Sequence, residues 1–191
     1  MSQLKKWKLR QSHWVLNNQW SKVRRDEVEL PDGTAIDDFF VNVRPDIAVV
    51  FAVTPQEEVV FVKQYRHGVG EILLELPAGS FNPKTEISEA AAVRELAEET
   101  GYVAEQTTHL ATLYDNPVKD TNSIHLFLAT NVVKKEETIQ LDITEEIEVV
   151  LIPLTKVREK IIEGEICVAG SISAIFLALE FFNNKNNFAN C

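Results

Sequence analysis

The sequence has little cysteine, no long apolar run and few basic residues relative to acidic ones. Two cysteines, Cys167 and Cys191, occur in 191 residues, which excludes a small scaffold held together by several disulfides. The longest apolar run, residues 47–53, is far shorter than the roughly 20 residues that a membrane-spanning helix needs. No apolar segment follows the basic residues near the N-terminus, so we expect no secretory signal and a cytoplasmic protein.

The charge balance limits the partners that the protein can have. There are 19 basic and 29 acidic residues, and the formal net charge is −10. Proteins that bind nucleic acid or anionic membranes through phosphate groups usually carry the opposite sign. We therefore expect no nucleic-acid partner, no membrane partner and no activity on RNA caps. An acidic protein can still bind a phosphorylated small molecule where metal ions screen the repulsion.

The apolar pattern predicts an α/β (α+β) fold. Short strands come first, followed by one helix, further strands and two C-terminal helices, an order that favours a mixed sheet with helices on its faces. The first helix is expected to have Ser88 as its N-cap and to end at Gly101. The other expected elements are strands at 20–30, 39–43, 47–53, 59–65, 72–76, 110–114, 125–129 and 148–153, and helices at 155–163 and 171–182.

The first helix places acidic residues in a fixed pattern. Glu95, Glu98 and Glu99 stand at i, i+3 and i+4, so they lie close together on one side of the helix. Carboxylates this close repel one another unless a cation lies among them, and Mg²⁺ or Mn²⁺ is the usual cation for such a cluster. The alternative is an ordinary solvated acidic face, which the flanking loop and the glycine stop make less attractive.

Residues around this cluster fit a cation site. The segment 77–79 (Pro-Ala-Gly) is expected to form a turn with free backbone carbonyls, which a hard cation accepts as ligands. Arg94 is adjacent to the glutamates, screens part of their charge and can reach back towards Glu86.

The segment resembles the Nudix box, G-x5-E-x7-R-E-U-x-E-E-x-G-U, where U is an apolar residue. Glu86, seven further residues and then Arg94–Tyr102 (RELAEETGY) match that pattern. One feature departs from it, because six residues rather than five separate Gly79 from Glu86. Alternatively, Ser80 stands at the glycine position of the box, and in either case the loop before the helix is altered.

The resemblance extends beyond the box to the ADP-ribose pyrophosphatases. The similar segments are residues 59–79 before the box, Pro117 after it and residues 147–166. This likeness implies a Nudix-type α/β/α sandwich with a mixed β-sheet. It also implies a small N-terminal β-rich arm at residues 1–45, for dimerisation and substrate binding, and a Nudix domain at 46–191.

The resemblance implies a metal-dependent hydrolase of a nucleoside diphosphate sugar. For ADP-ribose, water attacks a phosphorus atom of the diphosphate and releases AMP and ribose 5-phosphate. Carried over to this sequence, Glu95 and Glu99 are the main ligands of Mg²⁺ or Mn²⁺, and the carbonyl of Ala78 is a third ligand. Glu98 is a further ligand or a close catalytic neighbour.

Two more roles follow from the same resemblance. Glu86 and Arg94 are expected to form a pair that orients the helix and its loop. The general base is expected in the acidic loop that precedes the last predicted strand. We favour Glu146 for this role, with Glu145 as the second choice, although both also suit an ordinary charged loop.

Candidate substrate-binding residues lie outside the box. Arg66 follows a strand and can clamp a phosphate, or else form a surface salt bridge. Trp20 resembles the aromatic residue that stacks on adenine in dimeric relatives, and Phe39 or Phe40 can supply the second face, although core packing also explains all three. Arg44 is a candidate contact for phosphate or ribose.

The resemblance also predicts a homodimer, since related dimeric enzymes exchange N-terminal strands. The main functional alternative is hydrolysis of GDP-mannose or another nucleotide sugar, because the base-contacting residues are not fixed by the motif. An alternative from another class is a non-catalytic module that senses a nucleotide. Such modules typically lose box glutamates, whereas Glu95, Glu98 and Glu99 are all present here.

Overall fold

The computed structural model describes residues 4–141 and 146–189 of the chain. Within it the chain forms two compact units, and the smaller one combines the N-terminal residues with a later segment. The smaller unit is Met1–Pro45 with Tyr114–Ser123, and the larger unit is Asp46–Leu113 with Ile124–Cys191. The segment that carries Pro117 therefore belongs to the smaller unit. The proposed role of the N-terminal arm stays a prediction.

The larger unit is built on a mixed sheet of seven strands among the residues described. These strands are β4 (Asp46–Val53), β5 (Glu58–Arg66), β6 (Glu71–Glu75), β7 (Ala78–Phe81), β9 (Thr107–Tyr114), β10 (Ser123–Thr130) and β12 (Ile147–Pro153). Their order is β12-β5-β4-β10-β9, while β6 pairs with β5 and β7 pairs with β4. Strand β10 is parallel to β4, whereas β5 and β7 are antiparallel to it.

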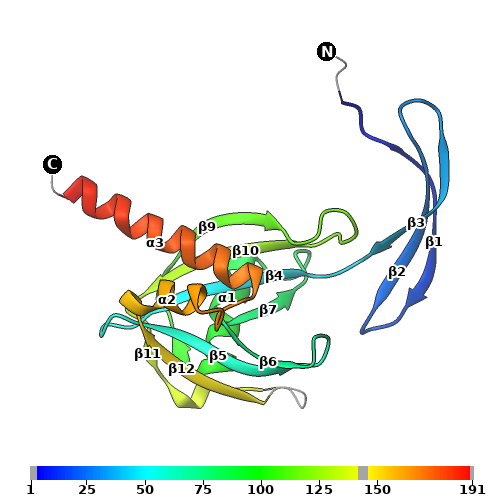
Figure 1. Ribbon diagram of the computed structural model, residues 1–191. Helices are drawn as coiled ribbons and strands as arrows, with labels where there is room; N and C mark the ends of the chain where they lie inside the picture. Colours follow the sequence, from blue (N-terminus) through cyan, green and yellow to red (C-terminus); the bar gives the residue numbers. More distant parts are fainter. Residues whose placement is uncertain (1–3, 142–145, 190–191) are drawn as a thin grey trace. The chain divides into compact units, whose positions relative to one another are not determined.

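Helices cover both faces of this sheet (Figure 1). Side chains of a strand alternate between its faces, so residues 49, 51 and 53 of β4 join one hydrophobic cluster and residues 48, 50 and 52 join another. The first cluster includes Ile175 of α3 and the second includes Leu96 of α1. The remaining elements are α1 (Ser88–Thr100), α2 (Val157–Ile162), α3 (Ala169–Ala189), β8 (Tyr102–Val103), β11 (Val133–Lys134), and two 3-10 helices, η1 (Glu136–Thr138) and η2 (Leu154–Lys156). This arrangement confirms the predicted α/β/α fold.

None of the helices in the described part of the chain is long and apolar enough to cross a membrane.

The two ends of α1 differ from each other in how well the sequence predicted them. Gly101 ends the helix as expected, with a φ of +73° and its N–H donating to the carbonyl of Ala97 at 2.9 Å. The N-cap is Ile87, so the prediction of Ser88 was wrong by one residue. The reason is that the first intrahelical hydrogen bond runs from the N–H of Ala91 to the carbonyl of Ile87, at 3.1 Å.

The segment 77–79 is not the turn that we expected. Ala78 begins β7, which pairs with the first half of β4, with Ala78 opposite Val49 and Gly79 opposite Ala48. Strand β4 pairs with β5 only near its end, at residues 52–53, so its first half is left with an edge that β7 fills. Pairing partners this distant in sequence override the local turn signal of proline and glycine.

The smaller unit contains a three-stranded antiparallel sheet in the order β1-β2-β3. Its strands are β1 (Lys8–Asn17), β2 (Lys22–Glu29) and β3 (Ala35–Asn42). The end of β3 is tied to the later segment of the same unit, because the N–H of Asn42 donates to the carbonyl of Lys119 at 2.7 Å. The side-chain amide of Asn42 also donates to Asp120 at 2.7 Å. Strand β1 was not among the expected elements.

Candidate active site

A polar cavity of about 540 Å³ lies within the larger unit, beside helix α1 and strand β7. The predicted box glutamates form most of its charged lining. The residues that line it are Gly79, Ser80, Arg94, Glu95, Glu98, Glu99, Gln140 and Leu141. The structure therefore brings together helix residues and two residues from a segment about 40 positions later in the chain.

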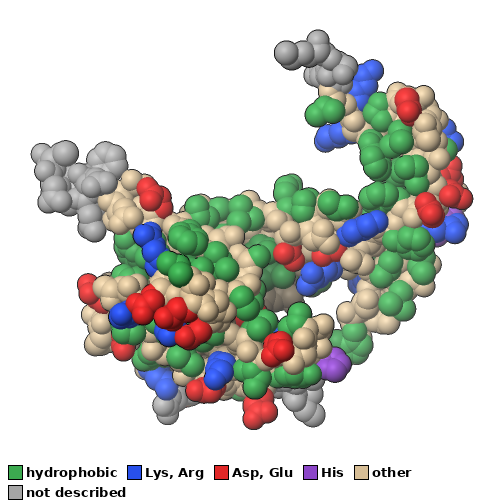
Figure 2. Space-filling view, viewed as in Figure 1, with side chains coloured by type: hydrophobic (Ala, Val, Ile, Leu, Met, Phe, Trp, Pro, Cys, Tyr) green, Lys and Arg blue, Asp and Glu red, His purple; other side chains and the backbone are tan. Residues whose placement is uncertain are grey.

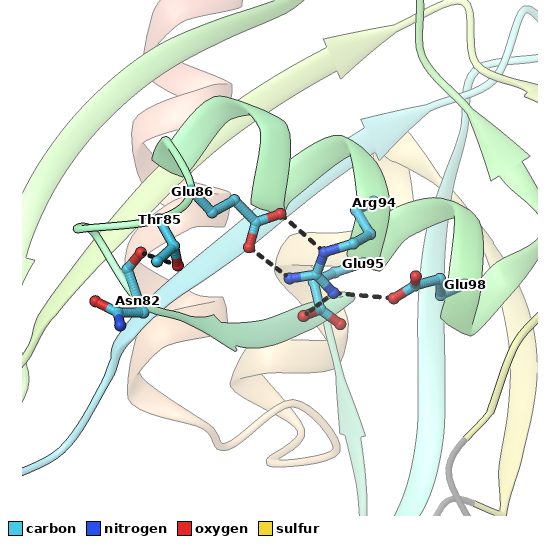
Figure 3. A network of polar contacts seen from close by, with 6 residues as sticks. All are labelled: Asn82, Thr85, Glu86, Arg94, Glu95 and Glu98. Carbon is cyan, nitrogen blue, oxygen red and sulfur yellow. Dashed lines mark hydrogen bonds and ion pairs between the residues drawn. The ribbon is translucent and has the colours of Figure 1, made fainter.

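Arg94 lies at the centre of the charged network (Figure 3). Its Nε and Nη2 donate to the two carboxylate oxygens of Glu86, at 2.9 and 3.0 Å. Its Nη1 donates to Glu95 at 2.8 Å and to Glu98 at 2.9 Å. A two-point contact between guanidinium and carboxylate fixes both groups in one plane. Arg94 therefore joins the loop before α1 to the acidic face of the helix.

The same contacts shift the titration of the pair. The pKa of Glu86 is held below its ordinary value, first by the hydrogen bonds from Arg94, while partial burial acts in the opposite direction. The pKa of Arg94 is raised, first by its hydrogen bond to Glu86. Both groups are therefore charged at neutral pH. The one guanidinium faces several carboxyl groups, so the cavity has an excess of negative charge.

Glu99 connects α1 to β7. Its side chain is buried, with only 5% of the residue exposed, and its Oε2 accepts a hydrogen bond from the N–H of Ala78 at 3.0 Å. A buried carboxylate needs such partners because its removal from water is costly. The contact places Glu99 directly beside Ala78, the residue whose carbonyl we predicted to be a metal ligand.

Gly79 allows Glu95 to approach the backbone of β7. A Cβ atom built on Gly79 would lie 1.8–2.1 Å from the carboxylate atoms of Glu95, which no real contact permits. The position that must lack a side chain is therefore Gly79, and the neighbouring Ser80 is exposed to solvent. This contact favours Gly79 over Ser80 as the glycine of the box.

Two known protein-domain families match this chain. The NUDIX domain model matches residues 43–166, which covers α1 and all the cavity-lining residues. The chain belongs to the Nudix family. A second model, the nucleoside diphosphate sugar hydrolase N-terminal domain, matches residues 7–42, which include the three-stranded sheet.

Known relatives agree with this Nudix assignment, and a solved structure shares the fold. The chain is 35% identical over 150 residues to an ADP-ribose pyrophosphatase of Bacillus subtilis, covering 78% of this chain and 80% of that protein. It is 32% identical over 161 residues to the methanol dehydrogenase activator of Bacillus methanolicus, covering 84% and 86%. A crystal structure of an ADP compounds hydrolase has the same fold, with a TM-score of 0.84 at 21% identity, covering 97% of this chain and 98% of that one. These findings confirm the resemblance that the box residues predicted.

The added residue of this Nudix box lies in the loop between Gly79 and Glu86. Asn82 closes that loop, because its Oδ1 accepts from the N–H of Lys84 at 3.0 Å and its carbonyl accepts from the N–H of Glu86 at 3.0 Å. The hydroxyl of Thr85 also donates to the carbonyl of Asn82, at 3.2 Å. The longer loop therefore still delivers Glu86 to Arg94.

Nudix hydrolases use divalent metal ions, and the cavity suits such a cation. Its potential ligands are carboxylate and backbone oxygens, the donors that hard divalent ions prefer, and its described lining contains neither histidine nor cysteine. Within residues 4–141 and 146–189, no three acidic, histidine or cysteine side chains converge on one point as a ready ligand set. Glu95 and Glu98 instead share Arg94, and Glu99 accepts from Ala78.

The candidate general bases lie at the edge of the described chain. Glu146 is exposed, directly before strand β12, and is not among the described residues that line the cavity. Glu145, the second candidate, lies outside the described residues. Their assignment stays a prediction.

Arg66, the predicted phosphate clamp, has a partner within the larger unit. Its Nε donates to Oε2 of Glu75 at 2.6 Å, and Glu75 is almost fully buried. Arg66 is not among the residues that line the cavity. The salt bridge that we considered as its alternative role is therefore present.

The other three substrate candidates belong to the smaller unit. Trp20 lies between β1 and β2 and is 87% exposed. Phe39 contacts the ring of Trp7 edge-on at 5.6 Å, and the ammonium group of Lys119 lies 4.4 Å from its ring centre. Arg44 pairs with Asp120 at 3.2 Å and with Asp115 at 3.6 Å. Trp20 is the most exposed of these three side chains.

Sequence reasoning missed Gln140 and Leu141. Both line the cavity, and the N–H of Gln140 donates to the carbonyl of Glu98 at 3.1 Å. No local motif marks either residue. The sequence offered only an indirect indication: the last carbonyls of a helix have no partner inside the helix, so some other group must approach the end of α1.

Proposed function

We propose that this chain hydrolyses the diphosphate bond of ADP-ribose or a similar nucleoside diphosphate sugar, in a reaction that needs Mg²⁺ or Mn²⁺. The products are a nucleoside monophosphate and a sugar phosphate. The observation that carries the proposal is the wall of the cavity, where α1 sets Glu95 and Glu99 against the bare backbone of Gly79 and the N–H of Ala78. The names of the relatives and of the N-terminal domain model support the same substrate class.

In this proposal, Glu95, Glu99 and the carbonyl of Ala78 hold the divalent ion, and Glu98 is a further ligand or a close neighbour. When bound, the ion supplies positive charge that neutralises the diphosphate and makes an attacking water more acidic. Arg94 and Glu86 hold the loop in a fixed position against the helix, through the two-point contact described above. Glu146, or Glu145, accepts a proton from the attacking water as the general base.

The smaller unit supports a homodimer as part of this proposal. Every residue of β1 is exposed, and large apolar side chains gather on the N-terminal sheet (Figure 2). They are Trp7, Leu9, Trp14, Val15, Leu16, Trp20 and Phe40. Exposed apolar side chains gathered on one small sheet often mark an interface, and aromatic residues contribute most to such contacts. A second copy of the chain is the partner that we propose.

Substrate binding by the smaller unit is assigned to Trp20 first. It is exposed and can stack on a base, a contact worth about 1–3 kcal/mol. Phe39 and Arg44 rank below it, because both already have partners inside their own unit. Arg66 ranks with them, since its guanidinium is held by Glu75. A cytoplasmic location stays a prediction.

The experiment that tests the proposal is a substrate panel. The protein is incubated with Mg²⁺ or Mn²⁺ and with ADP-ribose, GDP-mannose, UDP-glucose or diadenosine polyphosphates, and the products are separated. AMP and ribose 5-phosphate from ADP-ribose are the expected result, with one oxygen from ¹⁸O-labelled water in one product. Cleavage of GDP-mannose alone would correct the substrate. Binding of ADP-ribose without cleavage, under either metal, would contradict the enzymatic proposal and favour a sensing module.

A further inference from the structure

Helix α1 is anchored at its C-terminal end by a segment that lies outside the Nudix box residues. The last carbonyls of a helix have no partner inside it. Here the N–H of Gln140 donates to the carbonyl of Glu98 at 3.1 Å. The hydroxyl of Thr138 lies 3.1 Å from the carbonyl of Ala97, although it also reaches the carbonyl of Lys135 at 2.8 Å. The segment is thus held against the helix that carries the proposed metal ligands.

This anchoring brings Gln140 and Leu141 to the cavity, next to Glu98. Most polar side chains of the lining are charged, and the exceptions among the described lining residues are Ser80 and Gln140. A glutamine amide is neutral, donates two hydrogen bonds and accepts others. The amide therefore does not repel a diphosphate, as another carboxylate would. It also does not take the place of the cation that neutralises the diphosphate.

We propose that Gln140 is a substrate-binding residue, whose side-chain amide binds a sugar hydroxyl adjacent to the diphosphate. Leu141, beside it, offers an apolar contact to the C–H face of that sugar. The proposal rests on the proposed function, because a nucleoside diphosphate sugar carries such hydroxyls on either side of its diphosphate. Two sources carry the same chemistry, namely the ribose of the nucleoside and the terminal sugar.

The test compares Gln140→Ala with Gln106→Ala in the full-length protein. Gln106 is an exposed glutamine that does not line the cavity, so it controls for the loss of a surface amide. The backbone N–H of residue 140 remains in the variant and can still anchor the carbonyl of Glu98. We expect KM for ADP-ribose to rise about two- to tenfold in Gln140→Ala, with kcat and the Mg²⁺ requirement unchanged, because one neutral hydrogen bond is lost equally in substrate and transition state.

Gln140→Glu sharpens the test. It keeps the shape of the side chain but replaces the amide donors with a negative charge beside Glu98 and the diphosphate. KM is therefore expected to rise more than in Gln140→Ala. An equal or smaller rise would overturn the role of the amide as a donor.

Product inhibition distinguishes the two sugars. AMP carries only the nucleoside ribose, and ribose 5-phosphate carries only the terminal sugar. A weaker inhibition by one of them in Gln140→Ala supports the proposal and identifies the sugar. Equal weakening for both indicates a contact with the phosphate and overturns the sugar assignment, as does no change for either.

Two further results separate this proposal from the function on which it rests. If the unchanged protein cleaves no nucleoside diphosphate sugar, the proposed function fails. If the unchanged protein is active but Gln140→Ala keeps its KM, or lowers kcat and raises the Mg²⁺ requirement, Gln140 acts on the helix alone and the substrate contact is refuted.

Discussion

The two units of this protein differ in where they keep their apolar side chains. In the larger unit, both faces of the sheet are covered, and six of the eight residues of β4 are buried. In the smaller unit, all ten residues of β1 are exposed, including Trp14. Side-chain pairs such as Arg10 with Glu29 and Ser12 with Asp26 join β1 to β2 there. Exposed ion pairs add little stability, so the small sheet gains less from its own contacts.

This difference indicates that the two units have separate roles, one in chemistry and the other in assembly. The larger unit completes its own core and holds the entire proposed metal site on α1 and β7. The smaller unit presents an apolar surface that needs a cover, and a second copy of the chain can supply it. Chemistry should therefore depend on residues of the larger unit, and assembly on residues of the smaller one.

Of the variants proposed here, Glu99→Gln should have the largest effect, a loss of turnover with little change in stability. The amide oxygen can still accept the hydrogen bond from Ala78, so the melting temperature should change by only a few degrees. Losing a charged metal ligand should lower kcat on the order of 10³-fold. Steady-state kinetics and circular dichroism melting measure the two effects. Glu105→Gln, an exposed glutamate outside the cavity, is the control. Unchanged activity in Glu99→Gln would show that the metal site has been misassigned.

Gly79→Ala should have the next largest effect. Its new Cβ would displace the carboxylate of Glu95, the mobile end of a side chain, so the fold should survive while kcat falls about 10- to 100-fold. The matched control is Gly68→Ala, because a Cβ at Gly68 meets nothing within 4 Å and needs no unusual φ. Equal kinetics in the two variants would argue that Glu95 need not lie against β7.

These two positions illustrate what the sequence could and could not predict. The buried strands and α1 were predicted because their signals are local, an apolar run or a helical repeat that ends at Gly101. The assignment of the box glycine was ambiguous, because the five-residue spacing to Glu86 fits Ser80 whereas the residue type fits Gly79. The close approach of Glu95 to the backbone favours Gly79. Strand β7 was missed because its partner, β4, lies about 30 residues earlier in the chain.

The smaller unit was harder to predict for a related reason. Strand β1 has no buried face, so its residues carry no clear alternation of apolar and polar side chains. The ion pairs of Arg44 with Asp115 and Asp120 were not predicted, because these partners lie more than 70 residues later in the chain. Its role as a candidate substrate contact stays a prediction. Contacts across such separations leave no periodic signal in a single sequence.

Trp14→Lys tests whether the smaller unit forms the interface between two copies of the chain. A lysine on the exposed face of β1 should weaken self-association about 10- to 100-fold, since an aromatic contact is lost and a charge must be desolvated. Light scattering coupled to gel filtration, or sedimentation over a range of concentrations, measures it. Ile162→Lys introduces the same charge at an exposed apolar residue of α2 and should leave assembly unchanged. If the two variants behave alike, the N-terminal sheet is not the interface.

Glu57→Gly should have the smallest effect, a gain in stability confined to the larger unit. Glu57 has a φ of +59°, which costs a residue with a side chain about 1–2 kcal/mol, and glycine removes that strain at some cost in chain entropy. The net gain should be about 0.5–1 kcal/mol, or a few degrees in calorimetry. Its backbone bonds to Thr54 and Leu154 do not involve the side chain. Gln56→Gly, at a neighbour without a positive φ, should instead destabilise. If the units unfold separately, only one of two transitions should shift, whereas a single transition that moves as a whole would show that they unfold together.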